Sequence, residues 1–383
     1  MSSNTLFVIN IISHYQVPLF SRLSKMHNDN IHVVSVRDLP SMRKRLGWSF
    51  NSKNIPFSYE ILQEKKIRIF GVNFLFSPKI LSVLFDKKYD VVVIGGYYTL
   101  TAWLTLFVFK VRGKKVVLRS GTHKYSESNT SALSKFMKRI FIKYVDSYVA
   151  YGTFAKEYLV SLGAKSERIF IEFDTVDVKF LREKCIDENC LNADKRNIRK
   201  KSLGLDGKIA LYVGQLIERK NVITIIKTAE QLNTIIPELT FVIVGNGNQS
   251  DSLKSYVHNK NITNVQFVGS VKYEKVAEYY MAADVFMTMS VSDPYPLVIN
   301  EAMSFGCPII ISRNCGNSID LISNNGFVIN DPYDSKSTAV AVQSIILDKE
   351  LSITMAKESF DTIKKYDINN AANAIDSAIQ LIK

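Results

Sequence analysis

Short apolar runs rich in β-branched residues alternate along the chain with segments of helical periodicity. The runs expected to be strands are 5–10, 31–36, 90–95, 115–119, 147–151 and 168–173 in the first half, and 209–213, 240–244, 265–268, 285–289, 308–311 and 326–329 in the second half. Runs that are apolar at successive positions are typical of parallel strands covered by helices on both faces. Six strands in each half, with helices between them, predict an α/β protein with two Rossmann-like, doubly wound parallel sheets.

A polar segment divides the two halves. Residues 181–207 are charged and poor in aromatic side chains, which is typical of a linker. The sequence therefore predicts an amino-terminal domain at 1–178, a linker at 179–207, a carboxy-terminal domain at 208–365 and a last helix at 366–383. That helix is amphipathic and must dock, but its periodicity does not indicate on which domain.

Two apolar segments of the first half raise the question of a membrane. Residues 91–109 are apolar almost throughout, but Gly95 and Gly96 interrupt them, which favours a buried strand, a turn and a buried helix over a membrane span. Residues 131–145 carry an apolar stripe with cations beside it. The stripe comprises Leu133, Phe136, Met137, Ile140, Phe141 and Tyr144, and the cations are Lys135, Lys138, Arg139 and Lys143. Such a helix either rests on an anionic bilayer or packs on the sheet with a basic solvent face, and the second interpretation is favoured.

The distribution of charge along the chain indicates an anionic partner. The 383 residues carry a formal net charge of +13. Residues 1–178 hold 26 Lys and Arg against 13 Asp and Glu, whereas residues 208–383 hold 15 against 18. A one-sided basic field attracts nucleic acid, an anionic membrane surface or a phosphorylated substrate. The basic residues are scattered and accompany no recognition fold or stacking-aromatic motif, which argues against a nucleic-acid partner.

Composition and cysteine spacing indicate the cellular compartment in which the protein is expected. The hydrophobic share of 46% and the charged share of 22% are those of a soluble globular protein. Residues 1–10 lack the basic region and cleavage site of a signal peptide. Cys185, Cys190, Cys307 and Cys315 form no C-x-x-C pair. Four reduced thiols in a cytoplasmic protein are therefore expected.

Candidate chemistry lies in the loops after the strands, because ligands of open parallel sheets bind beyond the carboxyl ends of the strands. After strand 209–213, Gly214 permits a tight turn. Gln215, Arg219 and Lys220 then place an amide and two cations at the strand end. Two adjacent cations at this position suit a phosphate or diphosphate, and the alternative is a solvated pair that opens a helix.

A second loop, after strand 240–244, contains two glycines. Gly245 and Gly247 allow close approach of backbone to a ligand, and the following helix offers backbone N–H groups. The third glycine of the dinucleotide-binding fingerprint is missing. Two glycines in a strand-to-helix turn are by themselves a weak signal.

The loop after strand 285–289 carries two acids on either side of a proline-rich turn. Asp293 precedes Pro294, which keeps it extended, and Pro296 suits the first position of the helix that contains Glu301. The backbone N–H groups of Leu297, Val298 and Ile299 at the helix start are expected to form a site for an anion or hydroxyl with about half a positive charge.

These motifs together resemble the carboxy-terminal domain of family 4 retaining glycosyltransferases, which have the GT-B fold. The ordered set that carries the resemblance is 214–220, 244–247, 267–269, 283–286 and 293–308. The segment 10–25, "NIISHYQVPLFSRLSK", is similar to the start of members that assemble polysaccharides.

The resemblance implies roles for individual residues. Asp293 would contact the hydroxyls of the donor sugar, Glu301 the ribose of the nucleotide, and Lys220 the diphosphate. Further donor-binding positions that the resemblance and the loop pattern imply are Gly214, Gln215, Arg219, Gly245, Gly247, Val268, Tyr295, Leu297 and Val298. Two positions depart from the family pattern, since Asp293 stands where the family has Glu and Gln215 where it has Arg. Arg219 is the candidate replacement for that missing cation.

The first half is expected to bind the acceptor. His14 and Tyr15 follow the first strand, and His123 follows the strand at 115–119, where related enzymes have a polar group near the donor sugar. His123 is therefore a candidate catalytic residue together with Lys220, Asp293 and Glu301, while His14 and Tyr15 are acceptor-side candidates. A single histidine is also often structural.

The resulting hypothesis is a retaining glycosyltransferase that moves a sugar from a nucleotide-sugar donor to a lipid-linked saccharide. Its place would be the synthesis of bacterial surface polysaccharide such as O-antigen or lipopolysaccharide, at the inner face of the membrane. The sequence contains no Asp-x-Asp motif, so no metal or other cofactor is expected. The alternatives are a sugar-nucleotide epimerase on the same fold and a non-catalytic nucleotide-sugar-binding module.

Overall fold

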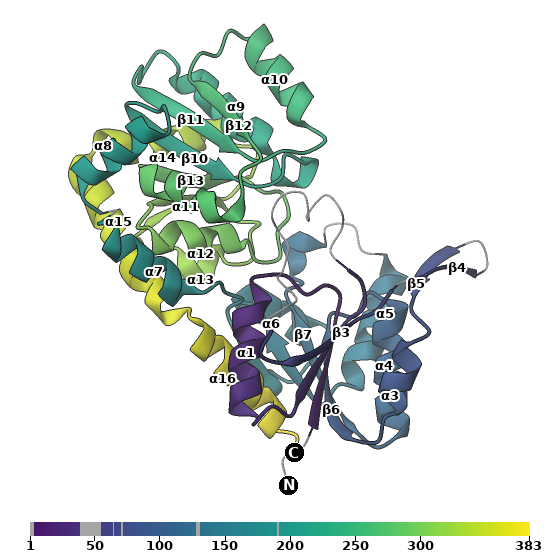
Figure 1. The fold of residues 1–383 in the computed structure, drawn as a ribbon. Helices are drawn as coiled ribbons and strands as arrows, with labels where there is room; N and C mark the ends of the chain where they lie inside the picture. Colours follow the sequence, from purple (N-terminus) through teal and green to yellow (C-terminus); the bar gives the residue numbers. More distant parts are fainter. Residues whose placement is uncertain (1–3, 39–54, 64, 70–71, 128–130, 190) are drawn as a thin grey trace. The chain divides into compact units, whose positions relative to one another are not determined.

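The computed structural model describes residues 4–38, 55–63, 65–69, 72–127, 131–189 and 191–383, and it divides into two compact units (Figure 1). Unit 1 comprises Met1–Asp174 and Ile368–Lys383, and unit 2 comprises Thr175–Asp367. Each unit is built around one parallel sheet with helices on both faces, as the apolar strand pattern predicts.

Unit 1 contains a sheet with strand order β3-β2-β1-β6-β7-β8-β9, parallel throughout. Its strands are β1 (Asn4–Ile9), β2 (Ile31–Ser35), β3 (Ser58–Ile61), β6 (Tyr89–Gly95), β7 (Lys115–Ser120), β8 (Ser147–Ala150) and β9 (Ile169–Ile171). A separate antiparallel hairpin joins β4 (Lys65–Ile69) to β5 (Val72–Phe76). Six of these strands overlap the predicted runs. The edge strand β3 and the hairpin are additional to the prediction.

Two groups of helices cover the faces of this sheet. The helices are α1 (Gln16–Met26), α3 (Ile80–Phe85), α4 (Leu100–Val111), α5 (Ala132–Lys143), α6 (Thr153–Ser161) and α16 (Ile368–Gln380), with short 3-10 turns η2 (Lys124–Ser126) and η3 (Ser166–Arg168). One core joins α1 and α16 to the strands, and the other joins α3, α4, α5 and α6 to them. The last helix therefore belongs to unit 1, where Ile375 and Ile379 are fully buried.

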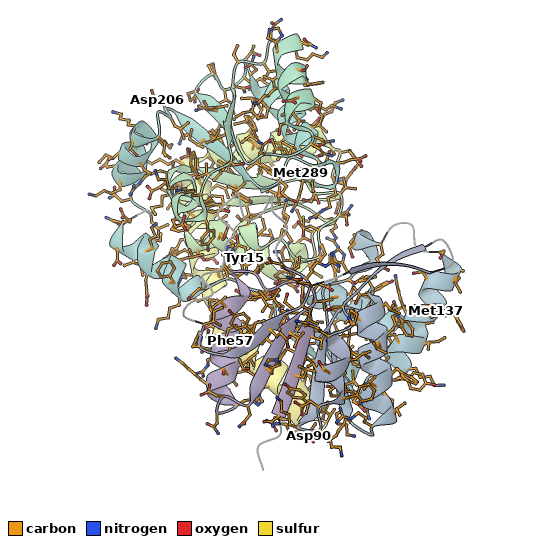
Figure 2. All side chains as sticks on the ribbon, turned by 45° about the vertical axis from the view of Figure 1, so that its right-hand side comes forward. Tyr15, Phe57, Asp90, Met137, Asp206 and Met289 are labelled. Atoms are coloured by element: carbon orange, nitrogen blue, oxygen red, sulfur yellow. The ribbon has the colours of Figure 1, made fainter. Side chains whose placement is uncertain are left out.

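The helix predicted at 131–145 forms, but the expected packing of its apolar stripe is wrong. Leu133 and Phe136 on α5 are 70% and 59% exposed, and Met137 lies on the outer side of the helix (Figure 2). The buried side of α5 instead holds Phe141 and the charged Lys138. The charged side chain is accommodated because Lys138 forms an ion pair with Glu127, whose carboxylate also accepts hydrogen bonds from Tyr98 and Tyr158.

The apolar segment at 91–109 folds as a strand, a turn and a helix, as predicted. Its strand, β6, is buried, but the helix α4 is buried only in part, since Phe107 is 65% exposed and the neighbouring Val111 is 71% exposed. Throughout the described ranges, no helix has both the length and the apolar character required to cross a membrane.

Unit 2 contains a parallel sheet with strand order β12-β11-β10-β13-β14-β15. Its strands are β10 (Lys208–Val213), β11 (Leu239–Val244), β12 (Val265–Gly269), β13 (Val285–Thr288), β14 (Ile309–Ser312) and β15 (Gly326–Ile329), and all six overlap predicted runs. Its helices are α7 (Val178–Asp187), α8 (Ala193–Ser202), α9 (Val222–Leu232), α10 (Ser250–Asn259), α11 (Tyr273–Ala282), α12 (Leu297–Ser304), α13 (Ser318–Leu321), α14 (Ser335–Leu347) and α15 (Lys349–Thr362), with η4 (Glu218–Lys220) and η5 (Ile363–Lys365). Helices α9, α10 and α14 share one core with the sheet, and α11 and α12 pack on the opposite face.

The segment predicted to be a linker is part of unit 2. Its helices α7 and α8 contact α12 and α11, respectively. On α8, the buried Lys200 donates to Asp284 Oδ2 at 2.7 Å and to the Gly207 carbonyl at 2.7 Å, and the same carboxylate oxygen accepts the Ile209 N–H. The segment is therefore a packed part of unit 2 that a buried ion pair attaches to the sheet, rather than a solvated connector.

The expectation of four reduced cysteines holds for two of them. Cys307 and Cys315 are free and fully buried, and burial raises the pKa of each thiol to about 12, so both stay protonated at neutral pH. Cys185 is disulfide-bonded, so the expectation is wrong for this residue. Cys190 lies outside the described residues.

Candidate functional site

The strand order of unit 2 reverses between β10 and β13. From β10 the chain proceeds through β11 to β12 in one direction, and from β13 through β14 to β15 in the other. The loops that follow the two central strands therefore leave the sheet in opposite directions, and such a reversal is the position at which open parallel sheets bind ligands. The residues after β10 are Gly214–Asn221, and those after β13 lead to Asp293.

Cations and an acid meet at this reversal point. Lys220 Nζ forms an ion pair with Asp293 Oδ2, and Arg219 Nη1 lies 3.7 Å from the same oxygen. Arg219 Nη1 also donates to the carbonyl of Ser292 at 3.1 Å. The side chains of Lys220 and Asp293 are 14% and 9% exposed, whereas that of Arg219 is 45% exposed. The structure therefore joins two predicted donor-binding elements that are 73 residues apart in sequence.

The backbone around these residues is held by polar contacts. Asn221 adopts the left-handed conformation (φ 51°), and its side-chain amide donates to the carbonyls of Met289 and Pro332 at 3.0 and 2.6 Å. On the other loop, the carbonyl of Asp293 accepts the N–H of Gly316 at 2.9 Å. These bonds fix the ends of both loops, so the Lys220–Asp293 pair is set by the fold rather than by side-chain contact alone.

Two of the predicted glycine positions are explained by close packing of loops. Gly245 has φ +137°, and a Cβ there would lie 1.8 Å from the Gly214 carbonyl oxygen. At Gly247, a Cβ would lie 2.1 Å from the carbonyl oxygen of Leu216, and the Gly247 N–H donates to Ser250 Oγ at 3.0 Å. The two glycines allow the β10 and β11 loops to touch. A direct contact with a ligand stays a prediction.

The start of α12 has two backbone N–H groups available. Pro296 is the residue before the helix rather than its first residue, and it provides no side-chain cap. The N–H of Ile299 bonds to the Pro296 carbonyl at 3.1 Å, so the expectation that it is available is wrong. The N–H groups of Leu297 and Val298 form no hydrogen bond with the described part of the chain. The positive end of the helix is therefore presented by these two residues.

Glu301 points toward α11. Its side chain is buried and accepts a hydrogen bond from the Tyr280 hydroxyl at 2.7 Å. It also lines a hollow of about 150 Å³, whose other walls include Tyr273 of α11 and Phe180 of α7. Burial, and then the charge of Glu301, raise the pKa of the Tyr273 hydroxyl. Glu301 is thus associated with a second group of side chains, and its predicted role beside a ribose stays a prediction.

Tyr273 and Tyr280 are absent from the sequence-based site. Residues seven apart on a helix lie on nearly the same face, and both tyrosines line the hollow beside Glu301. Their spacing, "YEKVAEYY", directly after the strand that ends at Gly269 was the available signal. It is ambiguous in a sequence, because tyrosines at helical spacing also occur in cores.

Three further donor-side predictions have defined surroundings. The carbonyl of Gln215 accepts the Tyr212 hydroxyl at 3.0 Å, which leaves the Gln215 side-chain amide out of that contact. Val268 lies half-buried in β12, and Tyr295 is 5% exposed directly before α12. Each therefore belongs to a loop or strand end on the carboxyl side of the unit 2 sheet.

In unit 1 the strand order also reverses, between β1 and β6. His14 and Tyr15 follow β1, and their rings lie 3.9 Å apart. Tyr97 and Tyr98 follow β6, with ring centroids 4.6 Å apart. The acceptor-side candidates therefore lie at the position where open parallel sheets bind ligands.

His123 has a different environment from the one expected. It is fully buried, and its ring lies 6.0 Å from that of Phe154 and 6.1 Å from that of Tyr125. Its backbone N–H and carbonyl both bond to Ser126 Oγ, at 2.9 and 2.8 Å, which starts the turn η2. In this structure His123 is a buried residue of the loop after β7 that packs against aromatic rings, and a catalytic role stays a prediction.

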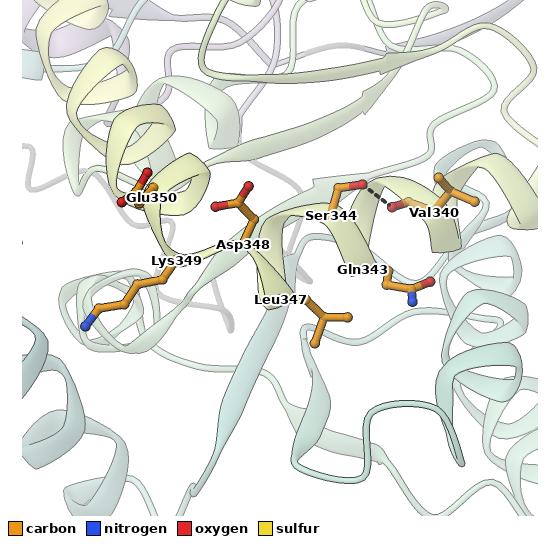
Figure 3. A pocket seen from close by; sticks show the side chains of 7 residues that line it. All are labelled: Val340, Gln343, Ser344, Leu347, Asp348, Lys349 and Glu350. Carbon is orange, nitrogen blue, oxygen red and sulfur yellow. Dashed lines mark hydrogen bonds between the residues drawn. The ribbon is translucent and has the colours of Figure 1, made fainter.

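A larger open hollow lies elsewhere in unit 2, where α14 ends and α15 begins (Figure 3). Its polar groups serve the helices themselves, since Ser344 Oγ donates to the Val340 carbonyl and Asp348 caps α15 through the Leu351 N–H. We therefore place the candidate site at β10 and β13. Within the ranges that the structure describes, no three His, Cys, Asp or Glu side chains gather as a metal ion would require.

Comparison with solved structures identifies the fold. The chain aligns with the crystal structure of Anabaena HepE in complex with UDP at a TM-score of 0.75 and 16% identity, over 98% of this chain and 99% of that one. It aligns with the apo lipopolysaccharide outer core galactosyltransferase WaaB at a TM-score of 0.68 and 15% identity, over 98% and 99%. The two parallel-sheet units therefore have the GT-B fold, and this prediction is confirmed.

Sequence comparison covers mainly unit 2. Residues 194–361 match the family model "Glycosyl transferases group 1". The chain is 30% identical over 198 residues to an uncharacterised glycosyltransferase of Methanocaldococcus jannaschii, covering 49% of this chain and 48% of the relative. It is 31% identical over 188 residues to the Escherichia coli UDP-Gal:alpha-D-GlcNAc-diphosphoundecaprenol alpha-1,3-galactosyltransferase, covering 45% and 48%. The matches thus span about half the length of these relatives.

Proposed function

We propose that this protein is a glycosyltransferase that transfers a sugar from a nucleotide-sugar donor with retention of anomeric configuration, as family 4 enzymes do. The observation that carries the proposal is the meeting of Lys220 and Arg219 with Asp293 at the strand reversal of unit 2. The group 1 match over 194–361 supports it, and so does the GT-B fold shared with a protein that binds UDP.

In the proposed reaction, the bond between the sugar C1 and the diphosphate oxygen breaks, and its electron pair stays on the diphosphate. The acceptor hydroxyl forms the new C1–O bond on the same face, and its proton passes to the departing phosphate oxygen. Lys220, Arg219 and the α12 N–H groups would stabilise the charge that develops on the diphosphate. No metal ion is required for this task if two cations and a helix start perform it.

Donor binding requires a change at the ion pair. In the structure Asp293 neutralises Lys220, so a diphosphate must compete with that carboxylate for the ammonium group. A donor satisfies both partners at once, because its sugar hydroxyls donate to Asp293 while its phosphate oxygens accept from Lys220. The shorter Asp in place of Glu is compatible with this arrangement, since Asp293 already lies within hydrogen-bonding reach of the cation that would hold the diphosphate.

The proposed acceptor is a lipid-linked saccharide of bacterial surface polysaccharide synthesis, bound by unit 1. Support comes from the basic first half and from the E. coli relative, whose name includes a diphosphoundecaprenol substrate. His14, Tyr15 and the neighbouring tyrosines after β6 are the groups offered to it.

A panel of nucleotide sugars tests the proposal. The expected result is thermal stabilisation by one donor and transfer of its sugar to a lipid-linked acceptor, with the anomeric configuration retained by NMR and the rate unchanged by EDTA. An epimerase would change the donor sugar without an acceptor, and a binding module would be stabilised without any turnover. Either outcome would overturn the proposed transfer, whereas full activity in a Lys220→Ala variant would overturn the assignment of the site.

A further inference from the structure

The outer faces of three neighbouring helices of unit 1 are apolar and exposed. The helices α3, α4 and α5 share one core on the same side of the sheet, and the rings of Trp103 on α4 and Phe141 on α5 are 5.1 Å apart (Figure 1). Their exposed large hydrophobic side chains are Leu81, Phe85, Leu100, Phe107, Val111, Leu133, Phe136, Met137 and Tyr144. We call this set the apolar surface. Many exposed apolar side chains on neighbouring helices mark a candidate site of interaction with a protein or a membrane.

Cations border the apolar surface on α5. At about 100° per residue, Leu133, Phe136, Met137 and Tyr144 fall within an arc of about 100° around the helix. The exposed Lys135, Arg139 and Lys143 fall in the next arc of about 80°, and the sequence of α5 contains no carboxylate. The remaining cation, Lys138, faces inward to Glu127 and takes no part.

A basic pocket continues this row of cations. It has a volume of about 390 Å³ and lies where α5 ends, bounded by residues 162–168 after α6. Four cations line it, Arg139 and Lys143 from α5 with Lys165 and Arg168 from beyond α6, and no acid is among the lining residues. A cation near the carboxyl end of a helix interacts favourably with the helix dipole. Four cations around one pocket are more than the two helix ends require, and together they suit an anionic group.

We propose that the apolar surface and its cationic border dock unit 1 on an anionic phospholipid bilayer, with a lipid phosphate in the basic pocket. Aromatic and aliphatic side chains beside Lys and Arg are the composition of elements that lie in the membrane interface. The proposal goes beyond the transfer reaction and uses none of its residues. It also assigns a partner, the anionic bilayer, to part of the excess of Lys and Arg in the first half of the chain.

A second copy of the chain fits this surface less well. In a symmetric contact the same patch of both copies meets, so the cations of α5 would approach their own counterparts. No carboxylate on α5 would neutralise them, whereas anionic lipid headgroups do. Charge complementarity therefore favours the bilayer.

Vesicle co-sedimentation of the full chain tests the proposal. Binding is expected to vesicles of phosphatidylcholine with phosphatidylglycerol, and much less to phosphatidylcholine alone. Since each Lys or Arg near such a surface contributes about 1 kcal/mol, Lys135→Gln with Arg139→Gln and Lys143→Gln should weaken binding to anionic vesicles roughly a hundredfold. Lys165→Gln with Arg168→Gln should reduce the preference for anionic lipid, while Leu133→Ser with Phe136→Ser should weaken binding to vesicles of either composition.

Matched variants on unit 2 serve as controls. Lys254→Gln with Lys260→Gln and Lys336→Gln removes three exposed cations, and Ile235→Ser with Ile353→Ser removes two exposed apolar side chains. Both should bind vesicles as the unaltered protein does, and all variants should keep their melting temperature. The proposal is overturned if the unit 1 variants bind as the controls do, if binding ignores anionic lipid, or if the Leu133 and Phe136 changes dissolve a dimer instead. None of these measurements depends on donor turnover, so failure of the transfer hypothesis would be seen separately.

Discussion

Variants of the Lys220–Asp293 pair can separate its contribution to stability from its proposed contribution to donor binding. Lys220→Ala leaves the Asp293 carboxylate, 9% exposed, with Arg219 at 3.7 Å as its remaining cation. Removing one partner of a fully buried pair costs about 3–5 kcal/mol. Because Arg219 remains and some solvent reaches the pair, we expect about 1–3 kcal/mol here. For a unit of this size, that corresponds to a fall in melting temperature of about 3–9 °C.

Adding Asp293→Asn to Lys220→Ala removes the carboxylate that has lost its nearest cation. The double variant should therefore regain part of the lost melting temperature, because an amide is less costly to bury than an unpaired carboxylate. Sugar transfer should not recover, since the diphosphate still lacks its cation. Loss of one such electrostatic contact lowers kcat by about 10²–10³-fold.

Thermal unfolding and transfer rates are measured on both variants, with Lys364→Ala as the control. Lys364 pairs with Asp361 at 2.7 Å, but their side chains are 53% and 45% exposed. Loss of this exposed pair should cost no more than about 1 kcal/mol. Recovery of transfer in the double variant would refute the donor-binding role of Lys220. An unchanged melting temperature in the single variant would refute the ion pair.

Three other changes test separate features. Tyr280→Phe removes the hydrogen bond to Glu301, which should cost about 1 kcal/mol of stability and weaken donor binding in calorimetry; unchanged donor affinity would separate Glu301 from the nucleotide. Gly245→Ala should cost more than about 2 kcal/mol because its Cβ meets a carbonyl oxygen, whereas Gly204→Ala, also at positive φ but with open space, should cost about 1 kcal/mol. Burial lowers the pKa of His27 below 6.5, so its contribution to stability is complete above pH 6.5 and is lost as the pH falls below that value. His27→Gln should flatten this decline in pH-dependent denaturant unfolding, and an unchanged slope would contradict the assignment.

The strands were predictable because a strand that is buried on both faces is apolar at successive positions. The edge strand β3, which the pattern missed, does not have an apolar run of this kind. The edge strand β3, "SYEI", has one fully exposed position and three that are only partly buried, since it pairs with β2 alone. The linker interpretation failed for a related reason, because most of α8 is exposed and polar, and the buried side chain that attaches it to unit 2, Lys200, is itself charged and paired with Asp284.

At the candidate site, the sequence indicated the residues but not their contacts. Lys220 and Asp293 were both expected at the ligand, because each follows a central strand. Their mutual ion pair depends on the distance between two loops, which the pattern does not contain. Glu301 was expected to face the same crevice, yet its hydrogen bond leads to Tyr280 on α11. The direction of a helical side chain depends on how its helix is rotated against the sheet, and the sequence pattern does not contain that rotation.

The helix α5 shows why a periodic pattern is ambiguous about its surroundings. An apolar stripe states where apolar side chains gather on a helix, and the same stripe suits a protein core or a bilayer. What decides between them here is the opposite face, where Lys138 is buried because Glu127, bonded also to Tyr98 and Tyr158, compensates its charge. That compensation comes from the loops after β6 and β7 and from α6, and the stripe lies on the outer side of the helix. A buried, paired cation opposite the stripe therefore shows that the stripe lies outside the core of unit 1, and this observation is available only from the fold.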